Sequence, residues 1–202
     1  MTVFQTYCEL GFHHIVSPQA TDHLAFLLAL SAPFAAPDWR RLLALVTSFT
    51  VGHSLTLALA VLGVVAVPVA LVEALIPVTV VLAALANFWR AGRPGSGGQM
   101  VVAERRSVVW TAANALALGF GLVHGLGFSN YLRALLGGAA RPFGELFAFN
   151  LGVEAGQVLV VGCLLGLNAL ALRSLGVSRR DWLLAVSGVA LGVAGLLLAQ
   201  LL

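Results

Sequence analysis

Histidines and carboxylates are the side chains of this sequence whose types and spacing could do chemistry. The five histidines and their candidate acidic partners are His13, His14, Asp22, His23, His53, Glu73, His124 and Glu154. Three histidines and the aspartate lie within residues 11–30, at the start of an apolar run, and the others lie inside four further apolar runs. Imidazole nitrogens and carboxylate oxygens suit divalent first-row metals such as Ni, Co, Zn, Fe and Mn. The set therefore predicts a metal site.

The apolar surroundings of these residues favour a functional role. An ionisable side chain in the middle of a membrane costs about 2.5–3.5 kcal/mol on insertion scales, so such a residue marks a candidate functional site. A single buried histidine, such as His53 or His124 taken alone, is more often a hydrogen-bonded packing residue. The interpretation as a metal site therefore depends on the five histidines and two deep glutamates taken together.

Other polar residues surround this set. Thr50, His53 and Thr56 lie on one face of a helix, and Asn150, Glu154 and Gln157 follow the spacing i, i+4, i+7 along another. The supporting polar residues that we predict are His13, Ser54, Thr56, Asn150 and Gln157. A structural role is expected instead for three asparagines that can join helices, Asn87, Asn114 and Asn168. Close packing is expected at the glycines of two motifs, Gly119, Gly121, Gly125 and Gly127, and Gly188 and Gly192.

The elements that position these side chains are predicted from hydropathy. The chain has 202 residues, of which 60% are hydrophobic and 9% charged, and its mean hydropathy is +0.99. A membrane-spanning helix needs roughly 20 apolar residues. Six stretches fit this description, at about 19–37, 42–64, 68–89, 107–136, 143–172 and 182–202. We expect an all-α fold, a polytopic transmembrane bundle of about six helices that forms a single domain over residues 1–202.

The placement of arginine predicts the orientation of this bundle. Nine of the 11 basic residues lie between segments 1 and 2, 3 and 4, or 5 and 6, namely Arg40, Arg41, Arg90, Arg93, Arg105, Arg106, Arg173, Arg179 and Arg180. The positive-inside rule places that side in the cytoplasm and both termini outside. The glycine- and arginine-rich connection at about 90–106 is then predicted to be a flexible cytoplasmic loop.

The predicted orientation indicates how deep in the membrane each ionisable residue lies. These residues are then expected in one band, near the middle or in the outer half of the membrane. A short repeat supports this placement: Val72-Glu73-Ala74 and Val153-Glu154-Ala155 each follow a helix that carries one histidine, His53 or His124. Parallel repeats of this kind place a transport site at their interface.

Composition also excludes several functions. The chain contains no lysine, so it has no P-loop and cannot drive transport with ATP by itself. Its arginines lie mainly between apolar runs, which indicates membrane topology and not a nucleic-acid surface. No lysine is available for Schiff-base chemistry.

Five stretches resemble the motifs of the HupE/UreJ family of bacterial membrane proteins. They are Gly11-Phe12-His13-His14-Ile15 with Asp22 to Leu30, Phe49 to Leu57, Val72 to Ile76, His124-Gly125-Leu126-Gly127-Phe128, and Phe149 to Gln157. The resemblance covers roughly residues 11–160 in the right order. It implies a nickel permease of the bacterial inner membrane that acts without ATP and is associated with hydrogenase and urease gene clusters. It further implies that His14, Asp22 and His23 are the metal-entry residues.

The leading hypothesis is a passive or gradient-driven importer of a divalent transition metal, with Ni²⁺ first and Zn²⁺ or Co²⁺ as other cargo. Its partners would be the ion and the lipid bilayer, with nickel-enzyme maturation proteins as further candidates. One alternative is an intramembrane zinc-dependent hydrolase with Glu73 or Glu154 as general base, although no His-Glu-x-x-His pair occurs. Others are a haem protein with His53 and His124 as axial ligands and a metal-loading accessory protein.

Overall fold

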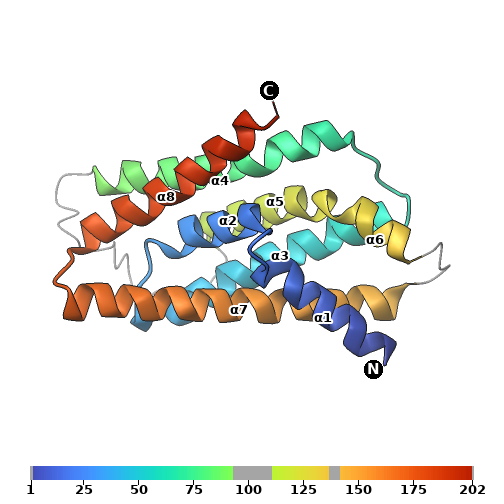
Figure 1. Ribbon diagram of the computed structural model, residues 1–202, viewed down its shortest axis with the longest axis horizontal. Coiled ribbons are helices and arrows are strands. Elements are labelled where there is room, and N and C mark those ends of the chain that lie inside the picture. Colours follow the sequence, from blue (N-terminus) through green and yellow to red (C-terminus); the bar gives the residue numbers. More distant parts are fainter. Residues whose placement is uncertain (1, 93–110, 137–141, 202) are drawn as a thin grey trace. The chain divides into compact units, whose positions relative to one another are not determined.

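The computed structural model describes residues 2–92, 111–136 and 142–201, and these residues form helices and no strands (Figure 1). The predicted all-α fold class is therefore confirmed. The predicted loop at about 90–106 lies almost entirely outside the described residues.

Eight α-helices and one 3-10 turn are described. They are α1 (Val3–Val16), α2 (Thr21–Ser31), η1 (Ala36–Asp38), α3 (Trp39–Val61), α4 (Val69–Ala91), α5 (Ala112–Gly127), α6 (Ser129–Leu135), α7 (Phe143–Ser174) and α8 (Arg179–Ala199).

Local sequence explains several of the helix ends. Thr2 and Gln5 form a capping box at the start of α1: the Thr2 amide donates to Gln5 Oε1 at 2.8 Å, and the Gln5 amide donates to Thr2 Oγ1 at 3.3 Å. Ser178 caps α8 by accepting from the Asp181 amide at 3.1 Å. Beyond the end of α3, Gly63 has a φ of 75°, a conformation that a side chain would disfavour.

Among the described residues, four helices are long and apolar enough to cross a membrane: Ala36–Val61, Val69–Ala91, Phe143–Ser174 and Arg179–Ala199. They correspond to the segments predicted at 42–64, 68–89, 143–172 and 182–202. A fifth span results if α5 and α6, which are bent by 47° at Phe128, are counted together. The predicted count of about six and the external location of both termini stay predictions.

The start of the chain differs most from the predicted segments. The stretch expected at 19–37 contains a helix of only 11 residues, α2, which ends shortly before Pro33. Proline disfavours the helical conformation of the residue before it, which favours a helix end at this point. At 1.5 Å per residue, α2 is about 16 Å long, roughly half the thickness of the hydrocarbon core. The helix α1, which precedes it, was not among the predicted segments.

The residues form two compact units. Unit 1 comprises Met1–Ala20, Ala44–Ile76 and Trp110–Val158, and unit 2 comprises Thr21–Leu43, Pro77–Val109 and Leu159–Leu202. The boundaries fall inside α3, α4 and α7, so each of these helices gives residues to both units. The single domain over 1–202 stays a prediction.

Glycines bring helix backbones into contact within unit 1. The Gly52 Cα on α3 lies so close to α5 that a Cβ there would overlap the Leu118 carbonyl oxygen, and a Cβ at Gly121 on α5 would overlap the carbonyl oxygen of Phe49. Close packing is thus confirmed for Gly121, and also for Gly125, where a Cβ would overlap the His53 carbonyl oxygen. Helices that approach this closely gain dispersion contacts, which drive helix association in membranes.

The same test corrects part of the glycine prediction. A Cβ at Gly127 would lie 2.8 Å from Ile76 Cδ1, which confirms a tight contact there. A Cβ at Gly119, Gly188 or Gly192 would meet no atom of the described residues within 4 Å, so the prediction of close packing at these three positions was wrong. Spacing places all of them on helices, but only the neighbouring helix decides which face is covered.

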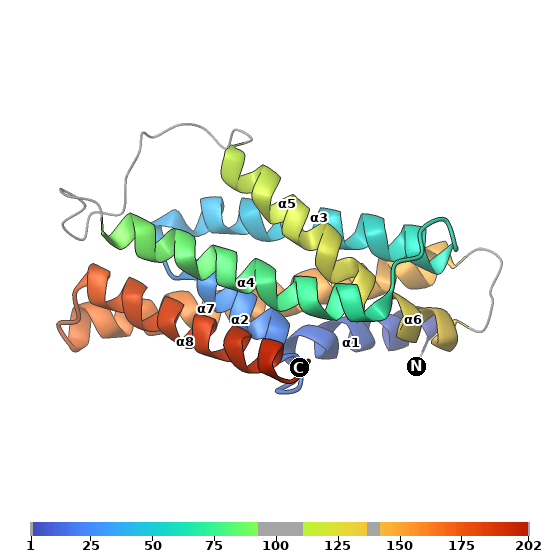
Figure 2. The ribbon, with the colours of Figure 1, turned by 90° about the horizontal axis from the view of Figure 1, so that it is seen from above.

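The helices of unit 2 are held together by hydrogen bonds from an asparagine and by a small hydrophobic core. α2 and α8 lie side by side (Figure 2), with Ala32, Ala91 and Leu183 in a common core. Asn87 Nδ2 on α4 donates to the Ala29 carbonyl oxygen at 2.8 Å and to Ser187 Oγ at 3.0 Å. The predicted joining role is confirmed for Asn87 and, in unit 1, for Asn114, whose Nδ2 donates to Ser48 Oγ at 3.0 Å.

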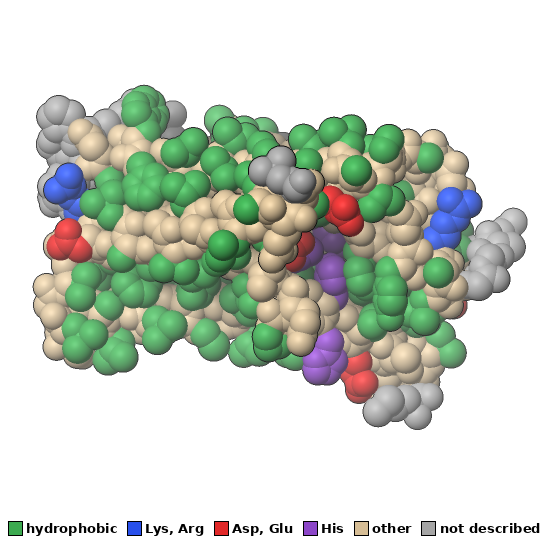
Figure 3. Space-filling view, turned by 45° about the horizontal axis from the view of Figure 1, so that its top comes forward, with side chains coloured by type: hydrophobic (Ala, Val, Ile, Leu, Met, Phe, Trp, Pro, Cys, Tyr) green, Lys and Arg blue, Asp and Glu red, His purple; other side chains and the backbone are tan. Residues whose placement is uncertain are grey.

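The surface fits a membrane protein. Figure 3 shows hydrophobic side chains spread over the face in view, with few charged ones among them. Large apolar side chains are exposed on several helices, including Leu82, Leu116, Leu170 and Leu196. Soluble monomers rarely expose so much contiguous apolar surface, whereas lipid covers it without cost.

Candidate functional site

His53 belongs to unit 1. It is on α3, fully buried, with its ring stacked on that of Phe49 one turn earlier at 6.2 Å between centroids. The opposite side of its backbone meets α5, where Gly121 and Gly125 lie against the His53 amide nitrogen and carbonyl oxygen. The position of this imidazole is therefore set by two helices in direct backbone contact.

His124, on α5, is also fully buried. Its ring approaches that of Phe49 edge-on at 5.1 Å. Phe49 is thus a shared neighbour of His53 and His124. Histidines from two helices that share one buried aromatic neighbour lie in a region of low polarity, where each electrostatic interaction is stronger than in water.

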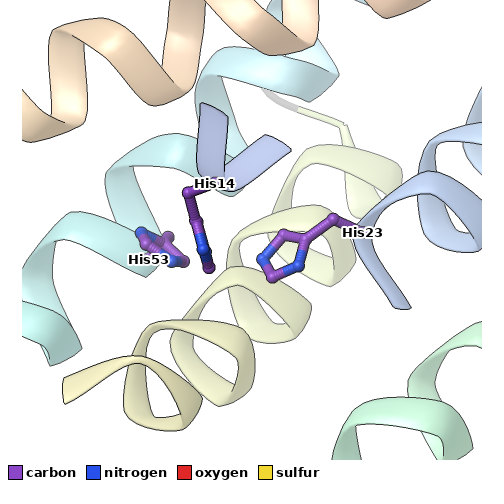
Figure 4. Close-up of side chains that lie close together, drawn as sticks. All are labelled: His14, His23 and His53. Atoms are coloured by element: carbon purple, nitrogen blue, oxygen red, sulfur yellow. The ribbon is translucent and has the colours of Figure 1, made fainter. Parts of the chain in front are cut away.

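His14, in the last turn of α1, is the third histidine of this unit. Its ring centroid lies 6.1 Å from that of His53, and Figure 4 shows the two side chains next to each other. Two imidazoles that share one ion have centroids up to about 6.4 Å apart, since a metal–nitrogen bond is about 2.0–2.1 Å long. The separation of His14 and His53 is therefore compatible with one bound ion.

Aromatic rings enclose His14. Its ring lies 4.1 Å from that of Phe128, at the bend between α5 and α6, and 5.6 Å from that of Phe149 on α7. Phe128 and Phe149 stack on each other at 5.1 Å. No role was predicted for these phenylalanines from the sequence. The sequence pattern that could have pointed to Phe149 is the repeat of Phe49-x-x-Gly52 as Phe149-x-x-Gly152.

The polar residues predicted on α7 make hydrogen bonds to α3. Glu154 Oε1 accepts from Thr47 Oγ1 at 2.6 Å, and Gln157 Oε1 accepts from Thr50 Oγ1 at 2.7 Å. Gln157 and Thr50 are both buried. These bonds orient the Glu154 carboxylate toward the helix that carries His53.

Two supporting residues make structural contacts. Thr56 Oγ1 donates to the Leu122 carbonyl oxygen at 2.8 Å, which links α3 to α5. Asn150 Nδ2 donates to the Leu146 carbonyl oxygen of its own helix at 2.8 Å. The Asn150 Oδ1 atom is buried and has no hydrogen-bond partner in the described part of the chain, so this oxygen is available to a ligand.

Asp22 and His23 belong to unit 2, and His23 is the third histidine labelled in Figure 4. His23 is buried, and its Nδ1 lies 3.0 Å from Asp22 Oδ1. A carboxylate that accepts from Nδ1–H holds the ring in one tautomer and leaves Nε2 with its lone pair for a metal. The adjacent acid and histidine of the sequence therefore lie within hydrogen-bonding distance of each other.

The remaining predicted residues are less enclosed. His13 is exposed on α1, with its ring edge-on to that of Phe12 at 5.9 Å. Glu73 is exposed on α4, and Ser54 is half-buried on α3. Unit 1 thus brings together His14 and His53, and Phe49 contacts both His53 and His124. The roles of Glu73, Ser54 and His13 stay predictions.

A comparison with protein families identifies the chain. The model of the family described as HupE / UreJ protein matches residues 1–200. No match was found among curated proteins or among solved structures. Because the family match extends over essentially the whole chain, the resemblance to this family is confirmed. The chain belongs to the HupE/UreJ family, which is associated with nickel and cobalt transport, and it is a multi-pass membrane protein.

Proposed function

We propose that this protein carries a divalent transition metal, nickel foremost, across the bacterial inner membrane through a histidine and carboxylate site. Transport is passive or driven by an existing gradient, and the ion is cargo. The observation that carries the proposal is the meeting of His14 and His53 from two helices of an apolar unit, 6.1 Å apart between ring centroids. A fully buried imidazole next to a second one is costly unless the pair is used.

The donor set suits a transported ion. Imidazole nitrogens and carboxylate oxygens bind Ni²⁺, Co²⁺ and Zn²⁺, and they bind less tightly than a closed cage of thiolates. A transport site must bind the ion and release it again. In this proposal His14, Asp22, His23, His53, Glu73, His124 and Glu154 are the metal-binding residues of the route.

The phenylalanines and the supporting polar residues stabilise the metal-binding residues and do not bind the ion themselves. The ring cluster around His14 and His53 keeps the imidazoles in a water-poor environment and limits their rotamers. The bond from Thr47 fixes the Glu154 carboxylate. No observation in the described residues favours the zinc-hydrolase alternative, so transport is the one function proposed.

Uptake of radioactive Ni²⁺ into proteoliposomes tests the proposal. We expect the protein to raise uptake above that of empty liposomes, and His53→Ala and His124→Ala to reduce it by about 100-fold or more, since loss of even an indirect partner of a metal ligand costs 10–100-fold. Cys163→Ser is the matched control, because this free and exposed cysteine lies outside the proposed site but has a side chain of a type that can bind metals. Wild-type protein without uptake, or equal rates for wild type and both histidine variants, would disprove the proposal.

A further inference from the structure

Two helix crossings in unit 1 have the same register. In the first, α5 lies on α3: a Cβ at Gly121 would overlap the Phe49 carbonyl oxygen and lie 3.0 Å from the His53 amide nitrogen. In the second, α1 lies on α7: a Cβ at Gly11 would overlap the Phe149 carbonyl oxygen and lie 3.0 Å from the Val153 amide nitrogen. The contacting atoms are the same in both.

The reciprocal glycines repeat the correspondence. A Cβ at Gly52 would overlap the carbonyl oxygen three residues before Gly121, and a Cβ at Gly152 would overlap the carbonyl oxygen three residues before Gly11. Each would also lie close to the amide nitrogen that follows the partner glycine, at 3.0 Å and 2.8 Å. The contacts thus match α1 with α5 at a shift of 110 residues and α3 with α7 at a shift of 100.

The histidines and the burial pattern obey the same correspondence. His14 and His124 each follow their glycine by three residues, and their rings lie 5.6 Å and 5.1 Å from the matching rings of Phe149 and Phe49. Residues 46–57 and 146–157 agree in burial at ten of twelve positions, all except 50 against 150 and 56 against 156.

The two crossings run in opposite directions. Within each crossing the helices are parallel, because the contacts advance together along both chains, as Gly152 against Phe12 and Gly156 against Ile15 show. In Figures 1 and 2, α1 and the unit 1 part of α7 run from right to left, whereas α5 and α3 run from left to right. Inverted repeats of this kind build many secondary transporters, and their substrate sites lie where the repeats meet.

We propose that unit 1 is an inverted duplication of one helix crossing, in which His14 and His124 are equivalent positions that exchange the transported metal with opposite sides of the membrane. The second part rests on the proposed function. His53 stands where the other copy has Val153, so the duplication has a single histidine at this position, which serves both. The ion would pass between His14 and His124 by way of His53.

Cysteine labelling tests the inversion without any metal. We replace the native cysteines, Cys8 and Cys163, by serine and introduce Val3→Cys or Ala112→Cys, which are exposed positions in the first turns of α1 and α5. A membrane-impermeant maleimide should label the two variants from opposite sides in right-side-out and inside-out vesicles. Labelling after detergent solubilisation confirms that both thiols react. Labelling of both variants from the same side would overturn the proposal.

The half-saturating Ni²⁺ concentration on each face tests the histidines. In oriented proteoliposomes we expect His14→Asn to raise it by about tenfold on one face and His124→Asn to raise it similarly on the other. His14→Gln and His124→Gln serve as second variants in case the Asn variants do not fold. A size-exclusion profile like that of the wild type shows that a variant is folded. An increase on the same face for both, or on neither, would contradict the proposal. If the wild type carries no metal, the proposed function fails while the labelling result still decides the inversion.

Discussion

The hydroxyl of Thr47 donates a hydrogen bond of 2.6 Å to the carboxylate of Glu154, which joins α3 to α7 inside unit 1. Each partner can be changed separately: Glu154→Gln keeps an oxygen that accepts from Thr47 but removes the charge. We expect the Ni²⁺ affinity of Glu154→Gln to fall by about tenfold, measured by titration calorimetry, with its thermal unfolding nearly unchanged.

The control for this prediction is Thr47→Val, which removes the hydrogen bond and leaves the charge. It should cost about 1 kcal/mol of unfolding free energy and reduce affinity less than Glu154→Gln does. If Thr47→Val lowered affinity as much as Glu154→Gln, the carboxylate would act through its orientation and not through its charge.

Acid should weaken metal uptake. An imidazole must be neutral to bind a metal, so protons compete with the ion for the histidines. We expect the half-saturating Ni²⁺ concentration to rise as the pH falls from about 7.5 to about 5.5, with the maximal rate largely kept, because histidine changes charge in this range. The measurement is initial uptake at several Ni²⁺ concentrations and equal pH on both sides of the membrane. A half-saturating concentration that does not change with pH would argue against histidine ligands.

The glycine contacts predict which substitutions destabilise unit 1. Gly52→Ala and Gly121→Ala each force a methyl group against a backbone carbonyl, so each should cost about 1–3 kcal/mol of unfolding free energy. Gly119→Ala is the matched control on the same helix, since its Cβ meets no described atom within 4 Å, and it should change stability by no more than about 1 kcal/mol. Unfolding in mixed micelles measures all three. Equal stability of Gly119→Ala and Gly121→Ala would contradict the close crossing.

Asn87 should couple to Ser187 in unit 2. The amide joins α4 to α2 and α8 through hydrogen bonds of 2.8 Å to the Ala29 carbonyl oxygen and 3.0 Å to Ser187 Oγ. A double-mutant cycle of Asn87→Ala and Ser187→Ala should give a coupling free energy of about 0.6 kcal/mol, the average of such bonds in membranes, and no more than about 1.7 kcal/mol. Additive effects of the two substitutions would show that the bond contributes no stability.

Much of the architecture could be predicted because membrane helices are encoded locally. An apolar run of about 20 residues is visible in the sequence without knowledge of any neighbour, and α4 and α7 lie within two residues of the predicted segments at 68–89 and 143–172. The histidines were recognisable as functional candidates for the same reason, since a polar residue in an apolar run is costly wherever it lies.

The crossings of unit 1 were not visible in the sequence. The two copies share only Gly11 with Gly121, His14 with His124, Phe49 with Phe149 and Gly52 with Gly152 over the segments that correspond, residues 8–16 and 46–57 with 118–126 and 146–157. The repeat expected from Glu73 and Glu154 has a different register, because in the structure Glu154 corresponds to Ser54.

The sequence by itself determined the fold class and the membrane setting, both of which depend on composition along the chain, and it supported the prediction of histidine and carboxylate ligands. Only the tertiary structure decided that α1 packs on α7 and that Phe49 contacts both His53 and His124. It also decided that a Cβ at Gly121 would overlap a backbone carbonyl oxygen, whereas one at Gly119 would meet no described atom within 4 Å. These facts depend on which faces of distant helices touch. The hydropathy of a helix is the same whichever neighbour it packs against, so it does not reveal which faces touch. The distances between helix backbones differ from one packing to another, and only the tertiary structure gives them.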